Sequence, residues 1–384
     1  MERVVDELRR FGPDRVGPGS APAMDERGAR AWCAALARGH YENFSVLSSL
    51  VPERLRDDFA AVYAFCRWSD DLGDEAGQAG EERLRLLAWW RGELEACFAG
   101  EARHPVFVAL RTTVAAHGLP IGPFDDLVRA FEDDQRIARY PTWDGLVGYC
   151  RRSADPVGRI VLGLFGARTA ANEALSDRIC TALQVVNHLQ DVRRDLLERD
   201  RIYLPAEFTA GIADFEARLR RSAELGHACD REFLAEYRAA VRPIADLCHG
   251  LFAEGRPLLD ALPADARPVV RLFVEGGESV LERIEAWNLE TCLHRPTLSR
   301  GRKAFLVARA WLSARSHCAR TNSAHWPGSC QARSRAGVSS KRRKSCAGRY
   351  VRPSPWSSRK SRRMFVSWNA MPRSTASACA PGSS

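Results

Sequence analysis

Apolar residues return every three or four positions along most of this 384-residue chain, and this repeat is the feature that most constrains its fold. The pattern is plain at Leu55, Phe59, Val62 and Cys66, and strand-like alternation is nearly absent. Spacings of three and four place side chains on one face of an α-helix. The sequence therefore predicts an all-α protein of about ten helices, broken at Pro/Gly clusters such as residues 117–120.

The helical pattern begins at Asp25 and continues to about Trp311, which predicts a single domain over residues 25–310. A domain of this length with 45% apolar residues in the chain can bury a large core. Residues 1–24 precede it and end in a stretch rich in Gly, Pro and Ala. We predict that they form a flexible lead-in.

Residues 311–384 differ in composition, with 17 Ser, 15 Lys and Arg, and no Asp or Glu. Of the 57 Lys and Arg in the chain, this leaves 42 against 48 Asp and Glu in residues 1–310, so the tail alone makes the chain basic. Such a composition cannot repay the entropy of ordering. We interpret the tail as either disordered or out-of-frame translation of a GC-rich gene. Nucleic-acid binding is not expected of the folded part, although a basic tail leaves it as an alternative.

The twelve cysteines stand singly, without the CxxC or Cys/His spacing of a metal site. This usage favours a reduced, cytoplasmic setting. No apolar run approaches the roughly 20 residues of a membrane-spanning helix, and the first ten residues lack the core of a signal peptide. We therefore expect a cytoplasmic protein whose contact with lipid, at the inner face of the membrane, is peripheral.

The segment around residue 70 carries three aspartates on one expected helical face. Asp70, Asp71 and Asp74 stand three, four and seven residues after Arg67, and positions so spaced are neighbours on a helix. Like charges this close cost stability unless cations lie between them, and carboxylate oxygens are the hard ligands that Mg²⁺ prefers. For this stretch alone, a solvated acidic helix end is an equal alternative.

A second stretch repeats the pattern, with Gln184, Asn187, Asp191 and Asp195 on one helical face. The two amides interrupt what is otherwise the apolar stripe of a buried helix. Burying them without partners would be costly, so we expect them to face a polar cavity. Two such helices across a cavity would hold a diphosphate through several bridging Mg²⁺ ions, with metal charge and nearby Arg side chains helping the leaving group depart.

Four linked segments resemble the squalene/phytoene synthase family in their order and spacing, over roughly residues 30–305. The segments are HYENF at His40 to Phe44, VYAFCR with the aspartates at Val62 to Asp74, YCRRSADPVG at Tyr149 to Gly158, and Asp191 to Pro205. Together they are specific where any one would be weak. The resemblance implies a single-domain isoprenoid (terpenoid) synthase fold, with helices around a central cavity.

The resemblance also implies roles for individual residues. The implied metal ligands are Asp70, Asp71, Asp74, Asp191 and Asp195. The implied substrate-binding residues are His40, Arg67, Gln184, Asn187, Arg201 and Tyr203, and the implied catalytic residues are Tyr63, Asn43 and Tyr149. Many relatives have Ser where this chain has Asn43, an amide that either positions water or caps a helix.

Within the family, the first and third segments resemble the bacterial hopanoid-pathway branch called hydroxysqualene synthase. This implies a Mg²⁺-dependent, prenyltransferase-type enzyme that converts presqualene diphosphate to hydroxysqualene without NADPH. One alternative is a synthase that joins two farnesyl or geranylgeranyl diphosphates into presqualene diphosphate, squalene or phytoene. Another is a helical assembly factor without turnover. The implied partners are the isoprenoid diphosphate and neighbouring pathway enzymes.

Other polar and aromatic residues have simpler interpretations. Trp89, Trp90 and Trp143 are predicted to pack helices together, because large aromatic side chains dominate core burial. The acidic run at residues 132–134, whose Asp134 stands where relatives carry an Asp, is either a third polar patch or a solvated helix face. His188 lies off the face of the amides and aspartates, so we expect it to be packed behind them.

Overall fold

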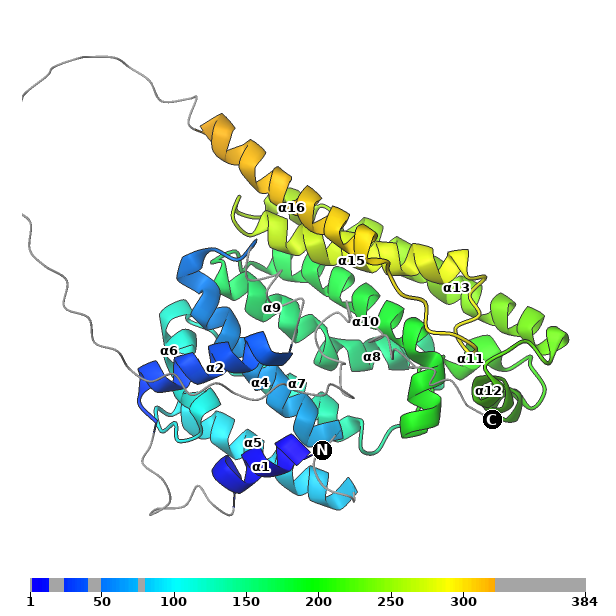
Figure 1. Cartoon of the computed structure of the whole chain (residues 1–384), viewed down its shortest axis with the longest axis horizontal. Helices are drawn as coiled ribbons and strands as arrows, with labels where there is room; N and C mark the ends of the chain where they lie inside the picture. The colour runs from blue at the N-terminus through cyan, green and yellow to red at the C-terminus, as the bar shows by residue number, and fades with distance from the viewer. Residues whose placement is uncertain (1, 14–23, 41–49, 75–79, 322–384) are drawn as a thin grey trace, which may run out of the picture.

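The computed structural model describes residues 2–13, 24–40, 50–74 and 80–321, with the side chains of residues 2–5, 39–40 and 313–321 excepted. In this part of the chain every regular element is helical apart from one isolated β-bridge, so the all-α prediction is confirmed (Figure 1). The elements are α1 (Glu2–Phe11), α2 (Glu26–His40), a 3₁₀ helix η1 (Glu53–Leu55), α4 (Arg56–Asp74), α5 (Gly80–Phe98), α6 (Pro105–His117), α7 (Gly122–Asp133), α8 (Trp143–Ser153), α9 (Asp155–Leu164), α10 (Ala170–Arg199), α11 (Ala206–Thr209), α12 (Phe215–Leu225), α13 (Arg231–Gly255), α14 (Leu258–Ala261), α15 (Arg267–Ala286) and α16 (Arg300–Thr321).

Helix α10 is the central element, and its 30 residues give it a length of about 45 Å. The Thr169 side chain caps its start by accepting a hydrogen bond from the Asn172 amide at 3.1 Å. It ends at Asp200, whose φ of 53° is left-handed. Helices α9, α13 and α15 pack along it, which explains why its sequence is apolar on more than one face (Figure 1).

Helix α4 is fixed from behind by aromatic packing. Trp68 stacks on Trp90 of α5 with ring centroids 5.3 Å apart, and Phe65 stacks on the same ring at 6.0 Å. The Trp90 indole donates a hydrogen bond to the Ser69 hydroxyl at 2.9 Å. All four side chains are buried, which confirms a packing role for Trp90 and leaves the opposite face of α4 for its aspartates.

The chain after α10 returns beside the segment between α7 and α8. The Ile202 amide donates to the Ala138 carbonyl at 2.9 Å, and the Ala206 amide donates to the Tyr140 carbonyl at 2.8 Å. These bonds accompany the bridge between Arg139 and Ile202. They fix the backbone on both sides of Tyr203, so this short pairing places predicted site residues at the end of α10.

The N-terminal boundary differs from the prediction of a flexible lead-in over residues 1–24. Residues 2–11 form α1, and the Phe11 ring packs edge-on against Trp32 and His104 with centroids 5.8 and 5.6 Å away. Leu8 of the same helix also packs against the core, so two apolar side chains dock this short, charged helix. The Gly- and Pro-rich residues 14–23 lie outside the described part.

The C-terminal boundary at residue 310 also differs, because α16 continues through it to Thr321. Leu306 and Ala310 are buried, and α16 packs against α15. The predicted boundary lies where acidic residues stop. The helix continues past it because apolar side chains of α16 still pack against α15. The predicted disorder or frame shift of the remaining tail, residues 322–384, lies outside the described part.

The eight cysteines whose side chains the structure describes are free thiols. Burial raises the pKa of the Cys33 thiol to about 12, so at neutral pH it stays protonated and packs as a small apolar group. Within the same ranges, no helix combines the length and apolar character that crossing a membrane requires.

The contact between α10 and α13 depends on a glycine. Alanine substitutions at two glycines of α13 should therefore change the free energy of unfolding in opposite directions. A Cβ on Gly255 would lie 2.8 Å from the Leu175 carbonyl oxygen and 2.5 Å from Ile179 Cγ1. Gly255→Ala is expected to lower the free energy of unfolding by about 1–3 kcal/mol, because overpacking forces the backbone apart. Gly250→Ala on the same helix, where a Cβ meets nothing within 4 Å, should raise it by about 0.5–1 kcal/mol. Urea unfolding measures both, and equal effects would contradict the packing argument.

Candidate active site

An apolar cavity lies beside α10, bordered by α4, α9, α14 and α15. Its volume is about 80 Å³, and it is open to solvent on one side. Its walls are formed mainly by apolar side chains, including Phe59, Val157, Val161, Ile179, Leu183 and Phe273. Gln184 and Asn187 also line it, so these amides do face a cavity, but its walls are mainly apolar rather than polar as predicted. The polar residues of α10 therefore begin where the apolar walls end.

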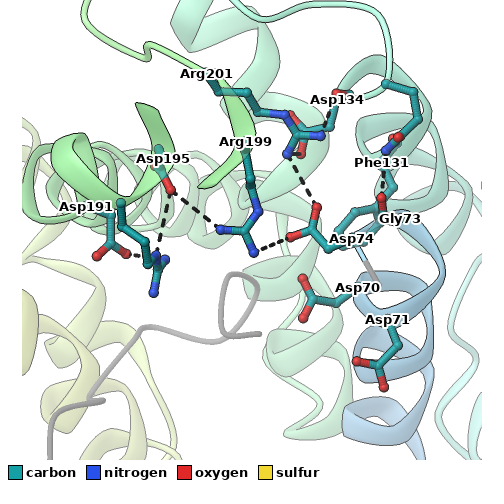
Figure 2. Close-up of polar contacts among 12 residues, drawn as sticks. Asp70, Asp71, Gly73, Asp74, Phe131, Asp134, Asp191, Asp195, Arg199 and Arg201 are labelled. Atoms are coloured by element: carbon teal, nitrogen blue, oxygen red, sulfur yellow. Dashed lines mark hydrogen bonds and ion pairs between the residues drawn. The ribbon is translucent and has the colours of Figure 1, made fainter. Parts of the chain in front are cut away.

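Asp70 and Asp74 of α4 point toward the side on which Arg199 lies (Figure 2). Asp70 and Asp71 are buried, and the side chains of Asp74 and Arg67 are 3% and 11% exposed. Arg67 Nη1 is 3.4 Å from Asp70 Oδ2, and its Nη2 donates to Asp71 Oδ1. Burial lowers the pKa of Arg67, but the carboxylates of Asp71 and Asp70 outweigh this and raise it above its ordinary value. The guanidinium thus stays charged, and it balances part of the acidic face.

Asp70 is a buried carboxylate whose charge is only partly compensated. Burial raises its pKa well above the ordinary range; Arg67 opposes this shift, and the neighbouring Asp74 and Asp71 add to it. Its Oδ1 atom is buried and has no hydrogen-bond partner. A buried acceptor left this way is costly, so the face of α4 is suited to receive a cation or donor.

The aspartates of α10 lie across from those of α4 and are also buried (Figure 2). Asp191 accepts a hydrogen bond from Arg194 Nη2 at 2.6 Å and another from Arg295, which comes from the loop before α16. Asp195 Oδ1 is 3.9 Å from Arg194 Nε. The two acidic faces expected from the sequence are therefore both present and buried.

Arg199 connects these two faces. Its Nη2 atom is 2.9 Å from Asp74 Oδ2 on α4, and its Nη1 atom is 3.9 Å from Asp195 Oδ1 on α10. Arg201 approaches the same Asp74 from the other side, with Nη1 3.4 Å from Oδ1. Figure 2 shows Arg199 extending between the two sets of carboxylates.

A buried carboxylate, Asp134, organises the residues behind Arg201. Tyr203 and Tyr149 donate hydrogen bonds to its two oxygens at 2.8 and 3.0 Å, and Arg201 Nη2 donates to its backbone carbonyl at 2.6 Å. The Tyr203 ring stacks on His188 with centroids 3.8 Å apart. Asp134 is thus part of a polar cluster rather than a solvated face, and His188 is packed as expected.

The remaining predicted residues have separate outcomes. Tyr63 is buried one turn before Arg67 and packs against Ala37 and Ala60, which places it between α2 and α4. Asn43 lies outside the described ranges. The same holds for the side chain of His40, whose backbone ends α2.

Sequence reasoning assigns no definite site role to three residues of this site, Asp134, Arg199 and Arg295. The sequence places Asp134 either in a polar patch or on a solvated helix face. Its partner Tyr203 is 69 positions away, so no local pattern decides between these alternatives. Arg295 meets Asp191 across 104 positions. Arg199 had a usable signal, because it follows Asp195 by four residues and so lies on the same helical face.

The donor set fits a hard cation such as Mg²⁺. Among the described residues, no three Asp, Glu, His or Cys side chains form a preassembled metal cluster. Mg²⁺ commonly binds through one or two carboxylates, with substrate phosphates and water as the other ligands. Asp70, with its unpartnered oxygen, is suited to this kind of site.

An all-α body with an apolar cavity and two acidic helix faces at one end defines the terpenoid synthase fold. The sequence profile of the squalene/phytoene synthase family matches residues 37–302, and the chain belongs to that family. The crystal structure of squalene synthase HpnC from Alicyclobacillus acidocaldarius is similar, with 42% identity and a TM-score of 0.61 over 68% of this chain and 95% of that one.

Two curated relatives show how the similarity is distributed. A hydroxysqualene synthase of Zymomonas mobilis is 39% identical over 180 residues, 46% of this chain and 59% of that protein. A 15-cis-phytoene synthase of Synechocystis is 28% identical over 311 residues, 78% of this chain and 89% of that protein. The chain thus spans less than two thirds of the curated hydroxysqualene synthases that it matches.

The Asp134 cluster can be tested by stability. Asp134→Asn removes the charge that faces two hydroxyls and Arg201 Nη1, which is 3.7 Å from Oδ2. It should lower the free energy of unfolding by about 1–3 kcal/mol. Asp133→Asn, which breaks a partly exposed pair with Arg152, should cost about 1 kcal/mol or less. Chemical unfolding of both variants checks this, and equal losses would mean that Asp134 is not a central acceptor.

Proposed function

We propose that the chain is a Mg²⁺-dependent, prenyltransferase-type synthase that converts presqualene diphosphate to hydroxysqualene and releases diphosphate. The observation that carries the proposal is the position of two buried acidic helix faces at the end of an apolar cavity. An isoprenoid diphosphate has matching parts, because its hydrocarbon chain suits the apolar cavity and its diphosphate suits metal ions held at the acidic faces. The names of the relatives with about 40% identity support the particular reaction.

The proposed step needs no reductant. The C–O bond to diphosphate breaks and its electron pair leaves with the diphosphate. After rearrangement of the cation, water adds its oxygen to carbon and loses one proton. Bound Mg²⁺ would supply positive charge to the departing diphosphate. Electrons therefore balance without NADPH.

The chain's own residues have three tasks in this proposal. Asp70, Asp71, Asp74, Asp191 and Asp195 hold the metal, and Arg67 and Arg201 hold the diphosphate. The apolar walls shield the cation from bulk water. Tyr149 is fixed by its hydrogen bond to Asp134, so its hydroxyl has one orientation near the site. Tyr63 and Asn43 remain proposed catalytic groups, and His40, Gln184, Asn187 and Tyr203 remain proposed substrate contacts.

Substrate and product are strongly apolar, so we further propose peripheral contact with the inner face of the membrane and hand-over to neighbouring pathway enzymes. The second candidate reaction is condensation of two farnesyl or geranylgeranyl diphosphates, which is favoured by the alignment to a phytoene synthase over most of this chain.

The substrate decides between these reactions. The purified protein with Mg²⁺ and presqualene diphosphate, without NADPH, is expected to form hydroxysqualene and diphosphate in equal amounts, measured by chromatography and phosphate release. Parallel incubations with farnesyl and with geranylgeranyl diphosphate test the condensation. Consumption of either one without any hydroxysqualene from presqualene diphosphate would reverse the order of the two candidates.

The acidic faces are tested by Asp71→Asn and Asp191→Asn. Each should reduce kcat by at least about 100-fold. Residues that only hydrogen-bond to a metal ligand already cost up to about 100-fold when changed, and a ligand itself should cost no less. The matched controls are Asp57→Asn and Asp177→Asn. Asp57 is exposed in the first turn of α4, and Asp177 of α10 pairs with Arg159 of α9, away from the aspartates of the site. Controls should retain wild-type kcat. Unchanged turnover in both site variants would mean that the paired carboxylates of α4 and α10 are not metal ligands.

A further inference from the structure

Resting on the proposed function, we propose that Arg199 is a latch that holds Asp74 and Asp195 together without metal. The guanidinium must leave both carboxylates before they bind Mg²⁺, and it then contacts the diphosphate. Arg199 was not among the site residues that the sequence motifs suggested. The inference concerns how this chain keeps two facing acidic helices stable when the site is empty of metal.

The geometry of Arg199 sets it apart from the neighbouring arginines. Arg67 contacts aspartates of α4, and Arg194 contacts aspartates of α10. Arg199 extends from the last turn of α10 to Asp74 on α4, while its other Nη atom stays near Asp195 on its own helix. One planar guanidinium therefore spans both faces, a geometry that its fixed fork of donors allows.

Burial makes this contact more than a surface ion pair. The side chain of Arg199 is 15% exposed, and those of Asp74 and Asp195 are 3% and 2% exposed. Breaking a buried pair leaves an uncompensated charge, which is strongly destabilising. The two helices consequently have a reason to keep Arg199 in place until another cation can replace it.

Charge balance explains why metal and diphosphate together replace Arg199 more readily than metal alone. Each of the five aspartates already has a guanidinium within 4 Å, so a metal ion alone must compete with a cation that is held in place. A diphosphate supplies new acceptor oxygens that suit the bidentate donors of Arg. The displaced Arg199 can then exchange carboxylates for phosphate, which couples the two binding events.

The test measures Mg²⁺ binding rather than turnover. Titration calorimetry with MgCl₂ alone should show that Arg199→Met binds Mg²⁺ about tenfold more tightly than wild type, a coupling typical of linked sites. In EDTA the same variant should melt at a lower temperature, because two buried carboxylates lose a partner. With inorganic pyrophosphate present, Mg²⁺ affinity should rise in wild type by a larger factor than in the variant.

Two further variants keep the test decisive. The control Arg178→Met changes another arginine of α10. It removes an exposed pair with Glu254 of α13 and should leave Mg²⁺ affinity unchanged. Arg199→Lys keeps the charge, but its compact ammonium lacks the planar fork of donors that spans Asp74 and Asp195, so its Mg²⁺ affinity should fall between wild type and Arg199→Met. If Arg199→Met does not fold, the lysine variant carries the test. Mg²⁺ affinity that is unchanged or weaker in the folded Arg199 variants would overturn the latch.

The latch and the proposed function can fail separately. Wild-type protein that forms hydroxysqualene, with Arg199 variants of unchanged Mg²⁺ affinity, would reject the latch alone. Altered Mg²⁺ affinity in the variants, without any isoprenoid product from the wild type, would reject the proposed reaction and keep the latch.

Discussion

The buried carboxylates of α4 and α10 can exist in the folded chain because guanidinium groups accompany them. Moving an unpaired carboxylate out of water costs more than a domain can easily offset. The compensating arginines come from distant parts of the chain, beginning at Arg67 on α4 and ending at Arg295 before α16. The site is therefore also a set of long-range contacts that joins the two halves of the fold.

Helix α10 combines two environments that a shorter helix could not hold. Its middle third lines the apolar cavity, and its last turns carry the aspartates. Gln184 and Asp195 are eleven residues apart, which is close to three full turns, so they lie on one line along the helix. On α4 the same interval separates Phe59 at the cavity from Asp70. Both helices thus change from apolar to acidic at a similar depth.

Much of this arrangement could be predicted from the sequence, because it depends on helical spacing. The three-and-four repeat indicates the helices, and the same spacing puts Asp70 with Asp74 and Asp191 with Asp195 on shared faces. Contacts between distant segments could not be predicted in this way. Nothing near Asp134 indicates that Tyr203 will reach it, since that depends on the backbone pairing of Ile202 with Ala138. Helices α1 and α16 extend beyond the predicted bounds of 25 and 310 for a related reason, because composition does not record that Leu8 and Phe11, or Leu306 and Ala310, pack on the core.

The left-handed residue at the end of α10 has a further consequence. In a continuing helix, residues two positions apart point to nearly opposite sides, yet Arg199 and Arg201 both reach Asp74. The φ of 53° at Asp200 between them redirects the chain and makes this convergence possible. Asp200 itself is exposed and is tied by Arg139 and Arg220. A residue at the position of Asp200 must therefore tolerate a left-handed φ. Such a requirement limits which residues can replace it, although its side chain is on the surface and is not among the residues proposed to contact a ligand.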